Sequence, residues 1–203
     1  MRRLRWIVIS GLALSLEAQT PVRVKFDTEQ VRVVSTTERP HQARRVGASN
    51  MNRVIVFLGD SQVTISSSGK QEKRAFKPGD AMWNPAGAEF IIENTGGTPV
   101  DNVLIELKKE PTAEPRVSEL DTVRVDPMHY KLEFENRQVR ILRVRYGPRE
   151  DGARHEHILS RVVVYVTDQL NGTKGTVNMA GPSIHAETNA SDLRAERIAV
   201  ELK

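Results

Sequence analysis

The chain has 203 residues, a length that suits one or two domains, and it contains no cysteine. The lack of cysteine excludes disulfides, thiolate catalysis and zinc or iron–sulfur sites with cysteine ligands. The net charge of +4 comes from 30 basic and 26 acidic residues that are interspersed, and aromatic residues make up 5% of the chain; this composition argues against nucleic-acid binding, which needs a concentrated basic patch and aromatic platforms.

Residues 1–18 are typical of a secretory signal peptide. Three arginines within the first five positions form a basic segment, and Trp6–Leu16 is an apolar run of 11 residues. This run is too short for a stable membrane span. We therefore expect cleavage after Ala18 and export of the mature protein to the periplasm or the extracellular space, with no stable membrane span after the signal is removed.

From residue 22 onward, the sequence consists of short runs rich in valine and isoleucine that end at glycine, proline, asparagine or aspartate. This pattern is typical of many short β-strands. We expect Thr36–Asn52 to be a polar loop and Ser66–Lys70 to be the turn of a hairpin. The strands predicted in this part are Val22–Phe26, Val31–Ser35, Arg53–Leu58, Gln62–Ile65, Glu72–Phe76, Ala81–Asn84, Phe90–Glu93 and Val100–Leu107.

Residues 109–129 are predicted to be a linker, because they contain three prolines and alternating charges. Within them, Val117–Val125 has the character of an ordered segment. His129 at the end of the linker and His41 in the earlier loop both lie in polar sequence. We therefore expect both side chains to be on the surface.

The second part of the chain repeats the first. Phe26–Asp60 aligns with Phe134–Asp168 without a gap, 108 positions apart, and Val103–Lys108 aligns with Ile198–Lys203, 95 positions apart. The second copy has therefore lost 13 residues, and the loss removes the predicted hairpin. A single copy of this size would bury a marginal core, so we expect the two copies to pack together. The copies are predicted over residues 22–108 and 130–203.

Three histidines distinguish the second copy from the first. His155 and His157 are separated by one residue in a predicted strand, so both side chains point to the same face. His185 lies on another predicted strand. Three convergent imidazoles are a suitable set of ligands for Fe, Mn, Zn, Ni or Cu. The first copy has Gly47, Ser49 and Phe90 at the corresponding positions.

The first copy contains a motif that resembles the second conserved motif of the cupin superfamily. Gly79 is followed after five residues by Pro85 and Gly87, and Asn94 closes the motif. Phe90 stands where the cupin motif has a histidine. The spacing therefore matches while the metal ligand is missing.

The second copy carries the histidines of both cupin motifs. His155 and His157 match the first motif, and His185 with Asn189 matches the second. The resemblance covers residues 22–203 and implies an all-β protein with two cupin-type β-barrels in tandem, a bicupin. It also implies a divalent metal in the second barrel.

Two positions depart from the first cupin motif, and Asp168, which stands where the motif has its closing glycine, is one of them. Arg161 stands where the motif has a glutamate ligand, and a guanidinium cannot ligate a cation. Its twin is Arg53, in the copy without histidines, so both arginines have either a structural role in ion pairs or a role in binding an anionic group of a substrate. Glu187 shares a face with His185 and is a candidate replacement ligand; the alternative is a three-histidine site completed by water.

Two classes of function follow from this resemblance. In the first, an exported cupin protein binds a divalent metal in its second barrel and binds or acts on a small molecule, by oxygenase or isomerase chemistry if it is an enzyme. In the second, the protein is a non-enzymatic small-molecule-binding or structural bicupin with a vestigial metal site. The expected partner is a small molecule and not a nucleic acid, and the expected state is a monomer or homodimer. Metal analysis discriminates the two classes.

Overall fold

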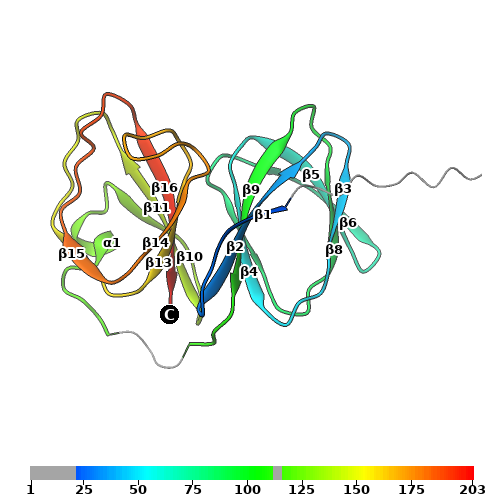
Figure 1. Ribbon diagram of the computed structural model, residues 1–203, viewed down its shortest axis with the longest axis horizontal. Helices are drawn as coiled ribbons and strands as arrows, with labels where there is room; N and C mark the ends of the chain where they lie inside the picture. The colour runs from blue at the N-terminus through cyan, green and yellow to red at the C-terminus, as the bar shows by residue number, and fades with distance from the viewer. Residues whose placement is uncertain (1–21, 112–115) are drawn as a thin grey trace, which may run out of the picture.

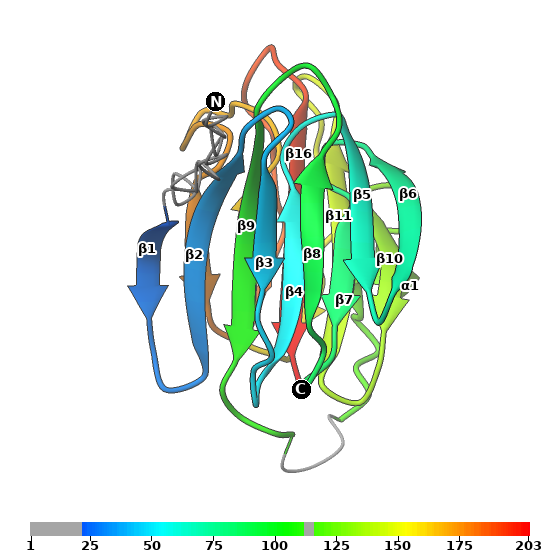
Figure 2. The same cartoon turned by 90° about the vertical axis from the view of Figure 1, so that its right-hand side faces the viewer.

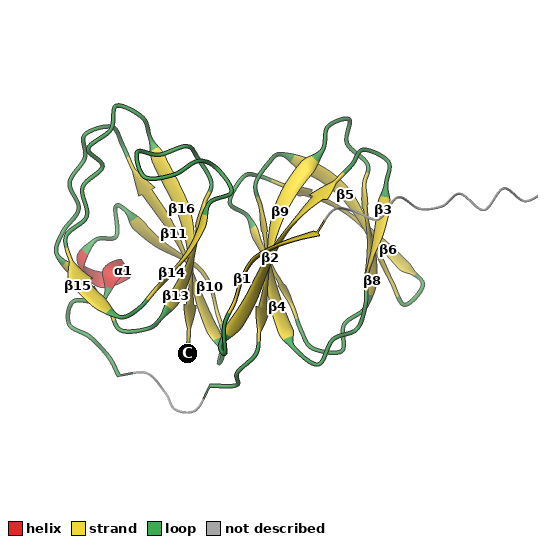
Figure 3. Ribbon diagram, viewed as in Figure 1, coloured by secondary structure: helices red, strands yellow, loops and turns green. Residues whose placement is uncertain are grey.

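The structure is a computed structural model that describes residues 22–111 and 116–203 (Figure 1). The signal peptide predicted over residues 1–18 lies outside the described residues. The described chain consists of strands, connecting loops and one short helix, α1 (Thr122–Val125) (Figure 3). The prediction of an all-β fold is therefore confirmed. No helix in these two ranges has the length and apolarity of a membrane span.

The first half of the chain forms a barrel from two antiparallel sheets that enclose one apolar core. The five-stranded sheet has the order β1–β2–β9–β4–β7, and the four-stranded sheet has the order β3–β8–β5–β6. The strands are β1 (Val22–Asp27), β2 (Val31–Glu38), β3 (Ala43–Val46), β4 (Asn52–Phe57), β5 (Ser61–Ser67), β6 (Lys70–Phe76), β7 (Ala81–Asn84), β8 (Phe90–Asn94) and β9 (Val100–Leu107).

The second half forms a second barrel with a smaller outer sheet. Its five-stranded sheet has the order β10–β11–β16–β13–β14, and its other sheet contains only β12 and β15 among the described residues. In place of the hairpin β5–β6 it has a tight turn closed by a bridge between Gln169 and Gly172. Two barrels in tandem are thus present. The strands are β10 (Tyr130–Glu135), β11 (Val139–Tyr146), β12 (His155–His157), β13 (Arg161–Tyr165), β14 (Val177–Ala180), β15 (Ser183–His185) and β16 (Ala195–Leu202).

Corresponding strands of the two halves pair in the same way. The β1–β2 and β10–β11 pairs each contain a register shift at the corresponding place. Arg53 pairs with Glu106 across β4 and β9, and Arg161 pairs with Glu201 across β13 and β16. Twin residues therefore begin from the same backbone position, and the first barrel is an internal control for the second.

The largest apolar core lies between the two barrels, where their five-stranded sheets pack against each other (Figures 1 and 2). Ile105 from the first half and Ile198 from the second are both 0% exposed. Because a domain of this size buries a marginal core by itself, the shared core stabilises both halves. The valines and isoleucines at the centre of this core are Val31, Val33, Val54, Val56, Val103, Ile105, Val139, Ile141, Val162, Val164, Ile198 and Val200.

A buried arginine adds a polar connection between the halves. Arg143 on β11 forms ion pairs with Asp80, Glu133 and Glu196 at 3.0, 3.1 and 2.6 Å. Gly79 lies directly against it: a Cβ at this position would be 2.7 Å from the Arg143 guanidinium, and its φ of +84° also disfavours other residues. The glycine of the cupin-like motif is thus required by both backbone conformation and close packing.

One loop predicted from the sequence is partly a strand. Thr36–Asn52 was expected to be a polar loop, but it contains the end of β2 and all of β3 (Ala43–Val46). The expectation is wrong because the polar residues of this segment are partners of one another: Arg44 forms an ion pair with the buried Glu38 at 2.6 Å. Apolar patterning therefore did not mark this strand.

The linker packs on the second barrel from residue 116 onward. The backbone N–H of Glu156 on β12 donates to the carbonyl oxygen of Leu120 at 2.7 Å, and Ser118 Oγ donates to the Glu156 carboxylate at 2.5 Å. Helix α1 follows within the segment that the sequence marked as ordered. The linker thus covers the outer face of the strand that carries His155 and His157.

Candidate metal centre

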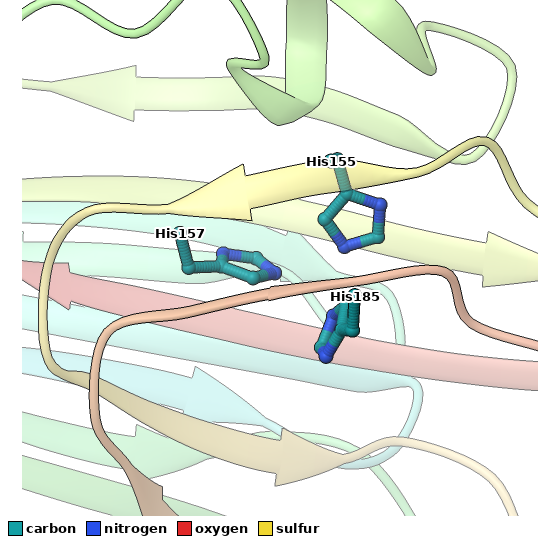
Figure 4. A group of neighbouring side chains, drawn as sticks. All are labelled: His155, His157 and His185. Atoms are coloured by element: carbon teal, nitrogen blue, oxygen red, sulfur yellow. The ribbon is translucent and has the colours of Figure 1, made fainter.

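Three histidines converge inside the second barrel. His155 and His157 lie at the two ends of β12, and His185 ends the antiparallel strand β15, in register with His155. One nitrogen atom of each ring lies within 4.8 Å of the others. Figure 4 shows the three rings grouped close together beside β12 and β15. The structure therefore brings together the three imidazoles singled out from the sequence.

Backbone and carboxylate partners orient two of the rings. His155 is 0% exposed, and its Nδ1 lies 2.8 Å from the carbonyl oxygen of Ala153. A carbonyl only accepts, so Nδ1 carries the hydrogen and Nε2 presents a lone pair. His157 Nδ1 lies 3.0 Å from Oε1 of Glu201, and a carboxylate also accepts, so Nε2 of His157 presents a lone pair as well. Such partners fix the tautomer that a metal requires.

The third ring has a buried nitrogen without a partner. His185 Nε2 makes no hydrogen bond to the described residues. A buried polar atom without a partner costs about 1–3 kcal/mol, so this atom fits a ligand that the protein itself does not supply. Burial lowers the pKa of His155 and of His185, and for His185 the neighbouring His155 and His157 lower the pKa further. Both rings are therefore held in the neutral form that binds metals.

Glu201 is a site residue that sequence reasoning missed. Its side chain is buried, and its carboxylate lies 3.0 Å from His157 and 3.4 Å from Arg140. The twin carboxylate, Glu106, instead forms ion pairs with two arginines of the first barrel. The aligned repeats contained the signal, because a glutamate follows an apolar run at both positions, in VLIELK and in IAVELK.

Replacing Glu201 with glutamine is expected to weaken metal binding by roughly 10–100-fold, because His157 loses the carboxylate that orients it. Competition with a chromophoric chelator measures the affinity. The matched control is Glu106→Gln, which changes the twin carboxylate in the barrel without histidines and is expected to leave the affinity unchanged. Equal affinities for Glu201→Gln and the unmodified protein would contradict the role assigned to Glu201.

Tyr130 is a second residue that sequence reasoning missed. Its hydroxyl lies 3.1 Å from His155 Nε2 and 3.1 Å from Glu187 Oε2. Burial, together with the nearby charge of Glu187, raises the pKa of Tyr130, so the phenol stays protonated and acts as a donor. Its twin is Val22, an exposed residue, so neither motif spacing nor the repeat marked this position.

Glu187 faces the same interior as the histidines. Its carboxylate accepts from Tyr130 and forms an ion pair with Arg197. The group of possible metal-ligand atoms within 4.8 Å of one another contains the three histidines and not Glu187. Arg197 in turn donates to Gln169 at 2.6 Å. The role of Glu187 as a metal ligand stays a prediction, and its present partners place it beside the site.

Arg161 is buried next to the histidines. Its guanidinium donates to the carbonyl oxygen of Gly181 at 2.7 Å and to Ser183 Oγ at 3.3 Å. It forms no ion pair within the described part of the chain. Burial lowers the pKa of Arg161. A structural ion pair, one of the two roles open from the sequence, is therefore not what holds this side chain.

The other two histidines lie outside this group. His41 is exposed, as expected from the sequence. The expectation for His129 is wrong: it is buried, stacks on Tyr146 with 4.1 Å between ring centroids, and places Nδ1 2.6 Å from Asp126. The polar sequence around it was misleading because its carboxylate partner is only three residues away and follows helix α1.

Several solved structures, one of them of a cupin barrel protein, resemble this one over most of the chain. AerE from Microcystis aeruginosa has a TM-score of 0.69 at 8% identity, covering 94% of this chain and 95% of that one. A cupin 2 conserved barrel domain protein from Leptotrichia buccalis has a TM-score of 0.56 at 13% identity, covering 93% and 91%. A variant of oxalate decarboxylase from Bacillus subtilis has a TM-score of 0.60 at 12% identity, covering 91% and 75%.

Comparison of the sequence alone finds less. No protein-family model matches it, and no curated protein matches it. The likeness to the solved structures therefore concerns the fold, and the chemistry has to be argued from the residues of the site.

Proposed function

Since the chain has the cupin fold in two tandem barrels, we propose that its second barrel binds one divalent metal ion and presents it to a small molecule. The ligands are His155, His157 and His185. The observation that carries the proposal is the buried, partnerless Nε2 of His185 beside two imidazoles that are already oriented. The imidazole set suits Fe, Mn, Zn, Ni or Cu.

Three protein ligands leave positions open at a metal for water or substrate. When bound, the ion supplies Lewis acidity and a template for the small molecule. The chain supplies orientation through Ala153 and Glu201, and it excludes bulk water because His155 and His157 are 0% and 3% exposed. Chemistry of the oxygenase or isomerase type is the enzymatic form of this proposal.

In this proposal the first barrel binds no metal. Phe90 occupies the position that corresponds to His185 and packs in the apolar core of the first barrel with Phe57 and Ile92. The place of the third imidazole is thus taken by a buried phenyl ring that cannot bind a metal. We therefore expect one metal ion per chain.

Metal analysis after loading and gel filtration tests the proposal. Purified protein is incubated with each of Fe(II), Mn(II), Zn(II), Ni(II) and Cu(II), and bound metal is measured by mass spectrometry of the digested sample. One equivalent of at least one of these ions supports the proposal. Absence of stoichiometric binding for all five ions contradicts it and favours the non-enzymatic bicupin with a vestigial site.

Export of the protein is part of the proposal and rests on residues 1–18. Expression of the whole chain in a bacterium, followed by fractionation and N-terminal sequencing, is expected to give mature protein that begins at Gln19 in the periplasm or medium. The basic segment and apolar run are the features that the export machinery reads. Recovery of the intact chain starting at Met1 from the cytoplasm would contradict export.

A further inference from the structure

Arg161 is a buried cation without a paired anion. Its residue is 6% exposed, and its two hydrogen bonds go to a backbone carbonyl and to a serine hydroxyl, both of which are neutral. No carboxylate of the described residues lies within ion-pair distance of it. Burying an unpaired charge costs free energy, so buried charges are normally paired. An arginine cannot avoid this cost by becoming neutral, because its guanidinium stays protonated in proteins.

The corresponding arginine of the first barrel, Arg53, is paired with a carboxylate. Arg53 Nε lies 3.5 Å from Oε1 of Glu106, its partner across β4 and β9. Arg161 has the same strand partner, Glu201. The corresponding oxygen of Glu201, Oε1, lies 3.0 Å from Nδ1 of His157 instead. The imidazole thus takes the carboxylate oxygen that the arginine contacts in the other barrel.

The remaining charges near Arg161 act from a greater distance. The carboxylates of Glu201 and Glu187 act on the guanidinium electrostatically, yet the effect of burial is larger and the pKa of Arg161 is lowered. Glu187 is itself paired with Arg197, and Glu201 is shared between His157 and Arg140. The interior of the second barrel therefore lacks one negative charge directly at this arginine.

The position of the guanidinium relates it to the three-histidine site. It bonds to Ser183, which pairs with His157 across β12 and β15, and its charge acts on His185. Its Nε–H makes no hydrogen bond within the described residues. A planar guanidinium with free N–H groups matches the two oxygens of a carboxylate.

We propose that Arg161 is the anchor for the carboxylate of a small monoanionic ligand that binds beside the three histidines. This inference rests on the proposed function and names its substrate class. A carboxylate there supplies the anion that Glu201 no longer provides to the arginine. The rest of the ligand then lies on the side of the histidines, where open metal positions face it.

The test uses metal-free protein, so that it does not depend on metal binding. Protein labelled with ¹⁵N is titrated with sodium acetate at constant chloride concentration, and amide signals and the Arg161 Nε–H signal are followed by NMR. Neutral acetamide and inorganic phosphate are titrated in parallel. Saturable shifts of the Arg161 signal with acetate, and none with acetamide, are the expected result.

Two arginine variants locate the site. Arg161→Gln is expected to weaken acetate binding at least about tenfold, the loss that corresponds to a hydrogen bond to a charged group. The matched control, Arg53→Gln, changes the twin arginine and is expected to leave acetate binding unchanged. If Arg161→Gln does not fold, as judged by circular dichroism, Arg161→Lys takes its place. The lysine retains the charge but lacks the two parallel N–H donors of the guanidinium, so it is expected to weaken binding as well.

Three results would overturn the assignment. The first is no saturable acetate binding to the unmodified protein, whether or not phosphate binds. The second is equal acetate binding by Arg161→Gln or by the folded Arg161→Lys, and the third is binding of acetamide as tight as that of acetate. Metal content is measured separately on the same preparations. If the unmodified protein binds acetate but no metal, the metal proposal is contradicted and the assignment of Arg161 is still supported.

Discussion

Replacing His155 and His157 together with alanine is expected to abolish stoichiometric metal binding. The two substitutions remove two of the three nitrogen atoms that lie within 4.8 Å of one another, and a single remaining imidazole cannot hold a divalent ion against water. The measurement is metal content after loading and gel filtration, together with chelator competition.

The control for this experiment is a histidine elsewhere in the chain. His41 is exposed in the first barrel, and His41→Ala is expected to bind metal as the unmodified protein does. Because His155 is fully buried, each variant is also checked by circular dichroism, and His157→Gln provides a ligand loss with little change in volume. Metal content that is unchanged in the folded double variant would show that the ion binds elsewhere.

Replacing Ile105 with alanine is expected to lower the free energy of unfolding by about 2–5 kcal/mol. Ile105 is 0% exposed and belongs to the core between the barrels, so the shorter side chain leaves a cavity that both five-stranded sheets line. Because the core is shared, both barrels are expected to lose stability together in one transition. Urea denaturation followed by far-ultraviolet circular dichroism and by fluorescence of Trp83 measures this.

The matched control is Ile91→Ala, the same substitution on β8, where the isoleucine is 44% exposed. There the expected loss is at most about 0.5 kcal/mol, as for surface substitutions in general. Two separate transitions, with only the first barrel destabilised by Ile105→Ala, would contradict the view that the shared core couples the barrels.

The strands with apolar alternation and the histidine pair were predictable because they obey short-range rules. Val22–Phe26 shows its period of two in the sequence, and the i, i+2 spacing of His155 and His157 already placed both rings on one face. The position of His185 opposite them required the likeness to cupins, because strand pairing between residues far apart is not encoded in local spacing. The structure then put His185 in register with His155.

The residues that were missed act through contacts between distant strands. Tyr130 on β10 contacts His155 from 25 residues away in the sequence, and Glu201 on β16 contacts His157 from 44 residues away. Neither belongs to a motif, and Glu201 stands out in the sequence only once it is compared with its twin, Glu106. His129 was misplaced for a related reason, since its burial depends on stacking against Tyr146 from the neighbouring strand.

X-ray absorption spectroscopy of the metal-loaded protein tests the central claim most directly. If the three histidines hold the ion, the spectrum of the zinc form shows three imidazole nitrogens at about 2.0–2.1 Å, and this imidazole signature disappears in the His155→Ala/His157→Ala variant. A first shell of oxygen atoms without imidazole scattering, or a spectrum that is the same in both proteins, would contradict the assignment of the metal to the second barrel.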